Sequence, residues 1–146
     1  MTRLHPGQKA PVFVCKDEQG ANIRLEDFKG KKNVLLVFYP GDDTPGCTKQ
    51  LCALRDDIGN FEKKDTVCFG INPQGAESHK RFIEKFKFPF HLLIDEKKQV
   101  CKAYGIGTLP FTKRTVVIIK KDGTIGYYEQ GMPSDEELLE AIDSFS

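Results

Sequence analysis

No stretch of this 146-residue sequence is apolar for long enough to cross a bilayer. The longest apolar run, VLLVFY at residues 34–39, is far shorter than the roughly 20 residues that a membrane helix needs. The amino terminus MTRLHPGQKAP lacks the apolar core of a secretory signal, and no Asn-x-Ser/Thr sequon occurs. We therefore expect a cytoplasmic protein with no membrane partner.

The sequence also lacks a surplus of charge of either sign. Its 22 Lys and Arg residues nearly balance its 21 Asp and Glu residues. Proteins that bind nucleic acid usually carry a basic surplus, so this composition predicts no nucleic-acid partner. Internal repeats, low-complexity segments and Pro/Gly-rich linkers are missing as well, and we expect a single domain over residues 1–146.

Cysteine is present in an odd number, five, in a chain long enough to form a core without disulfides. This usage favours a reducing compartment in which thiols carry out chemistry. Three of the cysteines lie in or beside apolar segments and are predicted to be core thiols: Cys15, Cys68 and Cys101. The three histidines have no metal-ligand spacing with the cysteines, so we predict no metal site.

Apolar runs that read as buried strands alternate with segments of helical periodicity. We predict strands at residues 32–39, 66–72 and 90–95, helices at 45–63, 76–87, 97–105 and 133–145, a hairpin at 114–130 and two short strands within 11–28. This order predicts an α/β fold with a mixed central sheet flanked by helices and an N-terminal β-hairpin. Functional sites of such sheets lie at the carboxyl ends of the strands.

Several boundary residues support this assignment. Asp122-Gly123 is typical of a hairpin turn, and Gly105 is suited to end a short helix. Ser134 is predicted to cap the last helix, with Glu137 completing a capping box.

The turn TPGC at residues 44–47 places a cysteine at the start of the helix 45–63. Thr44 is suited to cap this helix, and Pro45 fits its first position because the missing N–H has no partner there anyway. Cys47 then lies in the first turn, where free N–H groups and the positive end of the helix dipole stabilise a thiolate. The thiolate is the nucleophilic form of cysteine.

A second cysteine, Cys52, follows five residues later on the same helix. In an ideal helix the Cα atoms of residues five apart are about 8.6 Å from each other. A disulfide tolerates at most about 7 Å. Cys47 and Cys52 can therefore pair only if the first turns of the helix unwind. This suits a thiol that is oxidised to a sulfenic acid and then captured by its neighbour.

The stretches FYPGDDTPGCT at residues 38–48, RDD at 55–57 and KRTVVII at 113–119 resemble the peroxiredoxins, specifically the bacterioferritin-comigratory or peroxiredoxin Q branch. The resemblance extends over nearly the whole chain. Pro40, Thr44 and Cys47 fill the specific pattern Pro-x-x-x-Thr-x-x-Cys. The resemblance implies a thioredoxin-like fold and a peroxidase that reduces hydrogen peroxide and organic hydroperoxides.

It also implies a role for each matched residue. The Cys47 thiolate would attack the hydroperoxide, which the Thr44 hydroxyl and the N–H groups of Gly46 and Cys47 would bind. Pro40 would shield the sulfur from water. Arg114 would stabilise the thiolate and the charge that develops on the breaking O–O bond.

Cys52 would resolve the sulfenic acid as an intramolecular disulfide, and thioredoxin or a similar dithiol would reduce it. No metal, haem or flavin is required. Because both cysteines lie on one helix, a monomer is the expected state, although a dimer stays possible. Cys101 is the main rival as the resolving cysteine. Arg55 matches a supporting arginine of the family, whereas Gln50 stands where the branch usually carries glutamate and Leu54 where it carries an aromatic residue.

Two other functions stay open on the sequence. A thiol-disulfide oxidoreductase would favour Cys-x-x-Cys, and four residues separate the two cysteines here. A peroxide sensor or a holdase-like interaction protein would use the same cysteines as a peroxidase.

Overall fold

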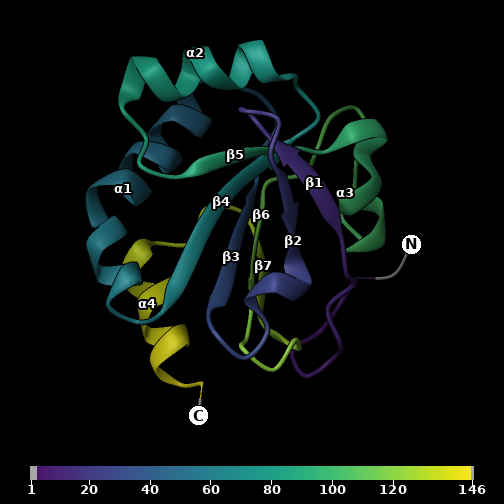
Figure 1. The fold of residues 1–146 in the computed structure, drawn as a ribbon, viewed down its shortest axis with the longest axis vertical. Helices are drawn as coiled ribbons and strands as arrows, with labels where there is room; N and C mark the ends of the chain where they lie inside the picture. Colours follow the sequence, from purple (N-terminus) through teal and green to yellow (C-terminus); the bar gives the residue numbers. More distant parts are fainter. Residues whose placement is uncertain (1–2, 146) are drawn as a thin grey trace.

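In residues 3–145, which the computed structural model describes, seven strands form one sheet in the order β2-β1-β5-β4-β3-β6-β7 (Figure 1). The central strands β3, β4 and β5 are parallel, and all other neighbours pair antiparallel. The strands are β1 (Val14–Asp17), β2 (Asn22–Arg24), β3 (Asn33–Phe38), β4 (Thr66–Asn72), β5 (His91–Ile94), β6 (Thr115–Ile119) and β7 (Ile125–Gln130). The predicted mixed sheet and N-terminal hairpin are confirmed.

The helices cover both faces of this sheet (Figure 1). They are α1 (Pro45–Glu62), α2 (Ala76–Phe86), α3 (Gln99–Ala103) and α4 (Asp135–Asp143), with 3-10 turns at Leu25–Phe28 and Glu96–Lys98. Apolar side chains of α1, α2 and α4 pack on one face, and those of α3 pack on the other. None of the helices among residues 3–145 combines the length and the apolar character that a membrane crossing requires.

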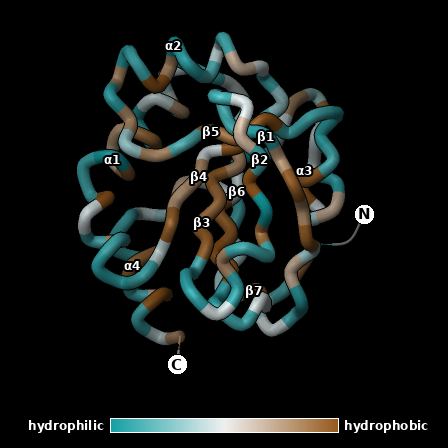
Figure 2. The backbone as a smooth tube through the Cα atoms, viewed as in Figure 1, coloured by the Kyte–Doolittle hydropathy of each residue, from teal (hydrophilic) through white to brown (hydrophobic). Residues whose placement is uncertain are grey.

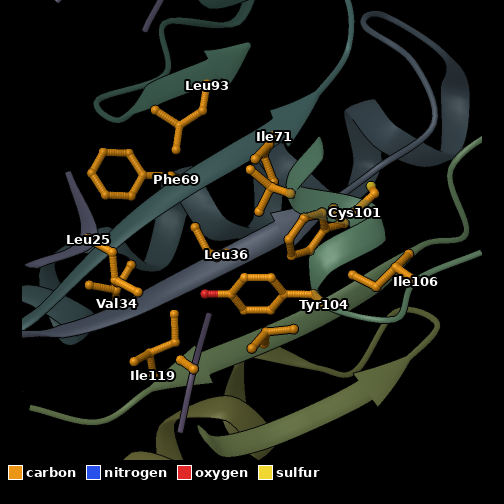
Figure 3. Close-up of a cluster of buried hydrophobic side chains, with 14 of the residues drawn as sticks. Leu25, Val34, Leu36, Phe69, Ile71, Leu93, Cys101, Tyr104, Ile106 and Ile119 are labelled. Atoms are coloured by element: carbon orange, nitrogen blue, oxygen red, sulfur yellow. The ribbon is translucent and has the colours of Figure 1, made fainter. Parts of the chain in front are cut away.

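Strand β3 shows why the fold has two cores. Side chains alternate across a strand, and every residue of β3 is buried, so the strand contributes to both faces. Val34, Leu36 and Phe38 belong to the core under α3, which Figure 3 shows around Tyr104 and Cys101. The alternate residues belong to the core under α1: Leu35, Val37 and Tyr39. In Figure 2 the central strands are accordingly the most hydrophobic part of the trace.

The register of the sheet brings three chain segments together at one end of the central strands. Phe38 pairs with Ile71 of β4 and with Thr115 of β6. The same end of the sheet therefore holds the segment after β3, the segment after β4 and Arg114, the residue before β6. This is the carboxyl end of the parallel strands, where a site is expected.

The predicted cap of α4 by Ser134 is confirmed, whereas the side-chain cap by Thr44 and the contribution of Glu137 to a capping box are not formed. Thr44 has the extended backbone of an N-cap residue, but its hydroxyl makes no capping bond and donates instead to the Gly41 carbonyl at 3.3 Å. Ser134 does cap α4 by accepting from Glu137 N–H at 3.2 Å. The Glu137 carboxylate, however, accepts the hydroxyl of Tyr127 from β7 and leaves the capping box half formed. In both cases a tertiary or loop partner outcompetes the local one.

The start of α4 carries a carboxyl group, that of Asp135, whose pKa is raised. Burial and the neighbouring Asp57 carboxyl of α1 raise the pKa of Asp135 to about 7. A carboxyl whose pKa is raised on folding stabilises the folded state at low pH. That contribution is lost as the pH rises from about 4 to about 7, because the native protein must then hold the ionised group beside Asp57.

We therefore expect Asp135→Asn to stabilise the protein above pH 7. The gain should be about 1 kcal/mol, since the partly exposed carboxyl is screened by water. It should shrink towards zero near pH 4. Urea unfolding at several pH values measures it. Glu136→Gln, an exposed acid one residue later, is the control and should show no such pH-dependent gain; a pH-independent effect of Asp135→Asn would contradict the assignment.

Candidate active site

The start of α1 leaves backbone donors free beside Cys47. Thr44 N-caps the helix by its backbone, and Pro45 occupies the first helical position. The first backbone bond of the helix runs from Thr48 N–H to the Thr44 carbonyl at 2.8 Å. The N–H groups of Gly46 and Cys47 therefore have no acceptor within the helix. They create a positive potential at the position of the Cys47 sulfur.

Arg114 brings a full positive charge to the same sulfur. Its Nη2 lies 3.4 Å from Cys47 Sγ, and its Nη1 donates to Gln50 Oε1 at 2.7 Å. Gln50 lies one turn after Cys47 on α1, so the helix itself orients the guanidinium. The glutamine thus supplies the acceptor that a glutamate would supply, without a second negative charge.

Gly46 provides the space that Arg114 occupies. A Cβ atom at this position would lie 3.1 Å from Arg114 Nη2, which is tighter than an ordinary contact. The glycine therefore lets the guanidinium stand beside the sulfur without the shift of a few tenths of an ångström that a Cβ atom would impose. The local sequence Pro-Gly-Cys consequently combines a helix start, an open side for Arg114 and the thiol.

The two thiols on α1 differ in exposure. Cys47 is fully buried, whereas Cys52 is partly exposed. Among residues 3–145 all five cysteines are free, and α1 runs without interruption through both positions. The structure therefore has the intact helix in which the predicted Cys47–Cys52 pair cannot bond.

Pro40 and Thr44 lie on the loop between β3 and α1, the helix that carries the thiol. Pro40 is half-buried and follows Tyr39, the buried residue directly after β3. Thr44 is exposed, and its hydroxyl bonds to the loop rather than to Cys47. The loop thus brings both residues to the start of α1.

The remaining cysteines are confirmed as core thiols. Burial, with the nearby Asp95 carboxylate, raises the pKa of Cys15 and of Cys101 to about 12, and burial raises that of Cys68. Cys101 lies under α3, in the core on the opposite face of the sheet from Cys47. Neither its position nor its proton affinity suits it to capture a sulfenic acid at Cys47.

Arg55 lies outside the contacts of the Cys47 sulfur. Its Nη1 donates to the Phe86 carbonyl at the end of α2 at 2.7 Å, and its Nε pairs with Asp56 at 3.0 Å. The residue therefore ties α1 to α2. It supports the helix that carries the thiols rather than the reacting atoms.

The structure brings together one set of possible metal ligands that the sequence spacing did not indicate, Asp17, Glu18 and His91. Their polar atoms already have partners. Glu18 accepts from His91 Nδ1 at 2.9 Å and from Leu92 N–H at 3.1 Å, and Asp17 accepts two backbone N–H groups of its own turn. The cluster is thus explained by hydrogen bonds that hold β1 beside β5.

Sequence reasoning missed a buried polar cluster behind the loop. It consists of Asp42 and the side chains that surround its carboxylate: Tyr39, Asn72, Gln74, Ser78 and His79. One signal was available, since His79 falls on the apolar face of α2 with Phe82 and Phe86. That periodicity predicts a buried histidine, but it does not identify a partner 37 residues away.

Comparison with known proteins decides the family. The sequence pattern of the AhpC/TSA family matches residues 6–128. The chain belongs to this family. It is 41% identical to a chloroplastic peroxiredoxin Q of Sedum lineare, over 97% of this chain and 80% of the relative. It is 36% identical to a putative peroxiredoxin bcp of Coxiella burnetii, over 95% and 97% of the two chains.

Solved peroxiredoxin structures share the fold. Peroxidoxin BcpB of Mycobacterium tuberculosis superposes with a TM-score of 0.90 at 26% identity, over 99% of both chains. PrxQ of Xylella fastidiosa gives a TM-score of 0.88 at 21% identity, over 99% of this chain and 98% of the other. The fold is therefore the thioredoxin-like fold of peroxiredoxins, and the chain is a thiol-dependent peroxidase. Its substrates are a peroxide and a thiol reductant.

We expect Gly46→Ala in this peroxiredoxin to slow peroxide oxidation of Cys47 several-fold without loss of stability. The new Cβ would lie 3.1 Å from Arg114 Nη2 and should shift the guanidinium by a few tenths of an ångström relative to the sulfur. Alanine meanwhile favours the helix by up to about 1 kcal/mol. The rate of peroxide consumption and the urea midpoint measure the two effects.

Gly59→Ala is the matched control, because Gly59 is exposed on the same helix and a Cβ there meets no other atom. It should stabilise α1 and leave the rate unchanged. Equal rates for Gly46→Ala and Gly59→Ala would show that the Arg114 contact does not matter.

Proposed function

We propose that Cys47 is the peroxidatic residue and that it reduces hydrogen peroxide and organic hydroperoxides. The observation that carries this proposal is the 3.4 Å contact between Arg114 Nη2 and Cys47 Sγ at an open helix start. The thiolate sulfur attacks the terminal oxygen of ROOH, the O–O bond breaks, and the sulfur becomes a sulfenic acid. The leaving RO⁻ takes up a proton and departs as an alcohol, or as water when the substrate is hydrogen peroxide.

The positive groups around the sulfur act on the charge that moves in this step. Negative charge passes from the thiolate to the leaving oxygen as the O–O bond breaks. Arg114 and the N–H groups of Gly46 and Cys47 stabilise it in both places. The Thr44 hydroxyl binds the peroxide once it turns from the Gly41 carbonyl. Pro40 keeps bulk water from the sulfur.

Cys52 resolves the sulfenic acid in our proposal. Its thiol attacks the Cys47 sulfur, a disulfide forms and water leaves. This step needs the first turns of α1 to unwind. Weak end stabilisation of the helix supports it: no side chain caps the start of α1, and its first turn has no acidic residue. A side-chain cap typically contributes about 1 kcal/mol.

The finer assignments of partner and place follow from the same thiols. We propose thioredoxin or a similar dithiol as the reductant, which takes over the disulfide and regenerates both thiols. A resolving cysteine on the same helix needs no second subunit, which supports a monomer. Five free thiols suit a reducing compartment, which supports the cytoplasm.

Replacement of single cysteines tests these roles. Cys47→Ser should abolish peroxide consumption. Cys52→Ser should consume a single equivalent of peroxide and then stop, because its sulfenic acid cannot form the disulfide that thioredoxin reduces. Turnover with thioredoxin and mass spectrometry of the oxidised peptides distinguish these outcomes.

Cys101→Ser is the matched control, since it removes a buried thiol on the opposite face of the sheet. It should turn over at the wild-type rate. Normal cycling of Cys52→Ser together with loss of cycling in Cys101→Ser would transfer the resolving role to Cys101. Continued consumption by Cys47→Ser would overturn the proposal as a whole.

A further inference from the structure

The loop that joins β3 to α1 has few backbone anchors of its own. The last backbone hydrogen bond between β3 and β4 runs from Tyr39 N–H to the Ile71 carbonyl at 3.3 Å, and the first hydrogen bond of α1 is donated by Thr48 N–H. Pro40 and Thr44 both lie between these two residues. Within the described residues, the one backbone N–H of this stretch with a hydrogen-bond acceptor is that of Asp42, which donates to Gln74 Oε1 at 2.5 Å.

The Asp42 side chain makes a much stronger anchor. Its carboxylate is 3% exposed and accepts four hydrogen bonds. Oδ1 accepts from the Tyr39 hydroxyl at 2.6 Å and from Asn72 Nδ2 at 3.2 Å. Oδ2 accepts from Ser78 Oγ at 2.6 Å and from His79 Nδ1 at 2.7 Å. The loop is thus tied at one point to β3, to the end of β4 and to α2.

His79 is the buried partner that faces this carboxylate from α2. Its ring is fully buried, and its Nε2 lies 2.9 Å from the Leu93 carbonyl. Both ring nitrogens therefore face oxygen atoms that only accept, the Asp42 carboxylate and a carbonyl. Both ring nitrogens are satisfied as donors when each carries a proton, and in that form Asp42 and His79 make a buried ion pair.

The carboxylate is well adapted to the ionised form. Burial by itself would raise the pKa of Asp42, but the hydrogen bond and charge of His79, with the hydrogen bonds from Ser78 and Tyr39, outweigh it and lower that pKa. The hydrogen-bonded pair of Asp42 and His79 lies behind the loop. Its partners come from α2 and the neighbouring strands, and Asp42 makes no hydrogen bond to Cys47 among residues 3–145.

We propose that Asp42, held by His79, is the positioning residue of the peroxide-binding loop. This inference rests on the proposed role of Pro40 and Thr44 at Cys47. Asp42 lies midway between Pro40 and Thr44 in the chain, so a shift of its carboxylate moves both. Misplacement of reacting groups by about 1 Å can cost a hundredfold in rate. A neutral asparagine would present an NH₂ group to donors that now face oxygen, and the loop would move to avoid the contact.

Asp42→Asn and His79→Gln test the proposal in the full chain. Each should slow the oxidation of Cys47 by hydrogen peroxide about tenfold or more. Because the two residues act as one unit, the double variant should lose no more than the worse single variant. The rate constant is measured by competition with a haem peroxidase for hydrogen peroxide. A loss in the double variant equal to the product of the single losses would refute the coupling.

A second readout separates positioning from a general disturbance of the thiol. The alkylation of Cys47 by iodoacetamide needs the thiolate but no peroxide-binding loop. In Asp42→Asn it should not slow while oxidation by peroxide does. A parallel fall of both rates would overturn the proposal, since the sulfur itself would then be impaired. So would peroxide oxidation at the wild-type rate in a folded Asp42→Asn protein.

Asp95→Asn is the matched control, because Asp95 is an equally buried carboxylate that accepts the backbone N–H groups of Val100 and Cys101 away from the loop. It should keep the oxidation rate within about twofold. If Asp42→Asn does not fold, Gln74→Ala removes the acceptor of the Asp42 N–H and should still slow oxidation several-fold; an unchanged rate refutes the proposal. Absence of Cys47 oxidation in the wild-type protein would instead contradict the proposed function.

Discussion

The antiparallel pairing of β3 with β6 fixes where Arg114 meets Cys47. Thr115 pairs with Phe38, so the residue before it stands at the end of β3, where the loop to α1 begins. The carbonyl of Arg114 also accepts from Gly131 N–H at 2.8 Å, which ties its backbone to the end of β7. A slip of one residue would reverse every side chain of β6 between the two cores. Because both faces of β6 are buried, the cores enforce the register that the site needs.

The same helix must satisfy two opposing requirements. Its intact first turn directs free N–H groups at the Cys47 sulfur, whereas a disulfide with Cys52 requires that turn to unwind. The end of the helix that unwinds in the proposed cycle has no side-chain cap, unlike the start of α4, which Ser134 caps. Leu54 and Phe61 are buried further along α1 and hold the rest of the helix to the sheet. The proposed unwinding therefore involves the start of α1 as far as Cys52, including the buried Leu51, while these two residues keep the rest of the helix on the sheet.

The sequence allowed most of the fold to be predicted, because the central strands β3, β4 and β6 are mainly apolar and the helices are periodic. Helix ends were harder: Glu137 satisfies the local capping pattern but bonds to Tyr127, a strand residue ten positions away. The contact of Arg114 with Cys47 agrees with an expectation taken from family resemblance, since no local pattern links residues 67 positions apart. The role of Asp42 could not be predicted from the sequence for the same reason. The partners of its carboxylate come from three separate segments and become a cluster only when the sheet register is known.

The position of the Asp42 loop also depends on a glycine in the core of the sheet. Gly70 of β4 lies beneath the ring of Tyr39, and a Cβ atom there would come within 3.0 Å of Tyr39 Cε1 and 2.7 Å of Leu92 Cδ2. Glycine usually weakens a strand, but here it lets the ring approach the backbone closely. The ring in turn directs its hydroxyl to Asp42. The loop side of the site is thus held by contacts that reach into the sheet, whereas the helix side is held by a turn without a side-chain cap. Opening of the helix start can therefore leave the loop in place.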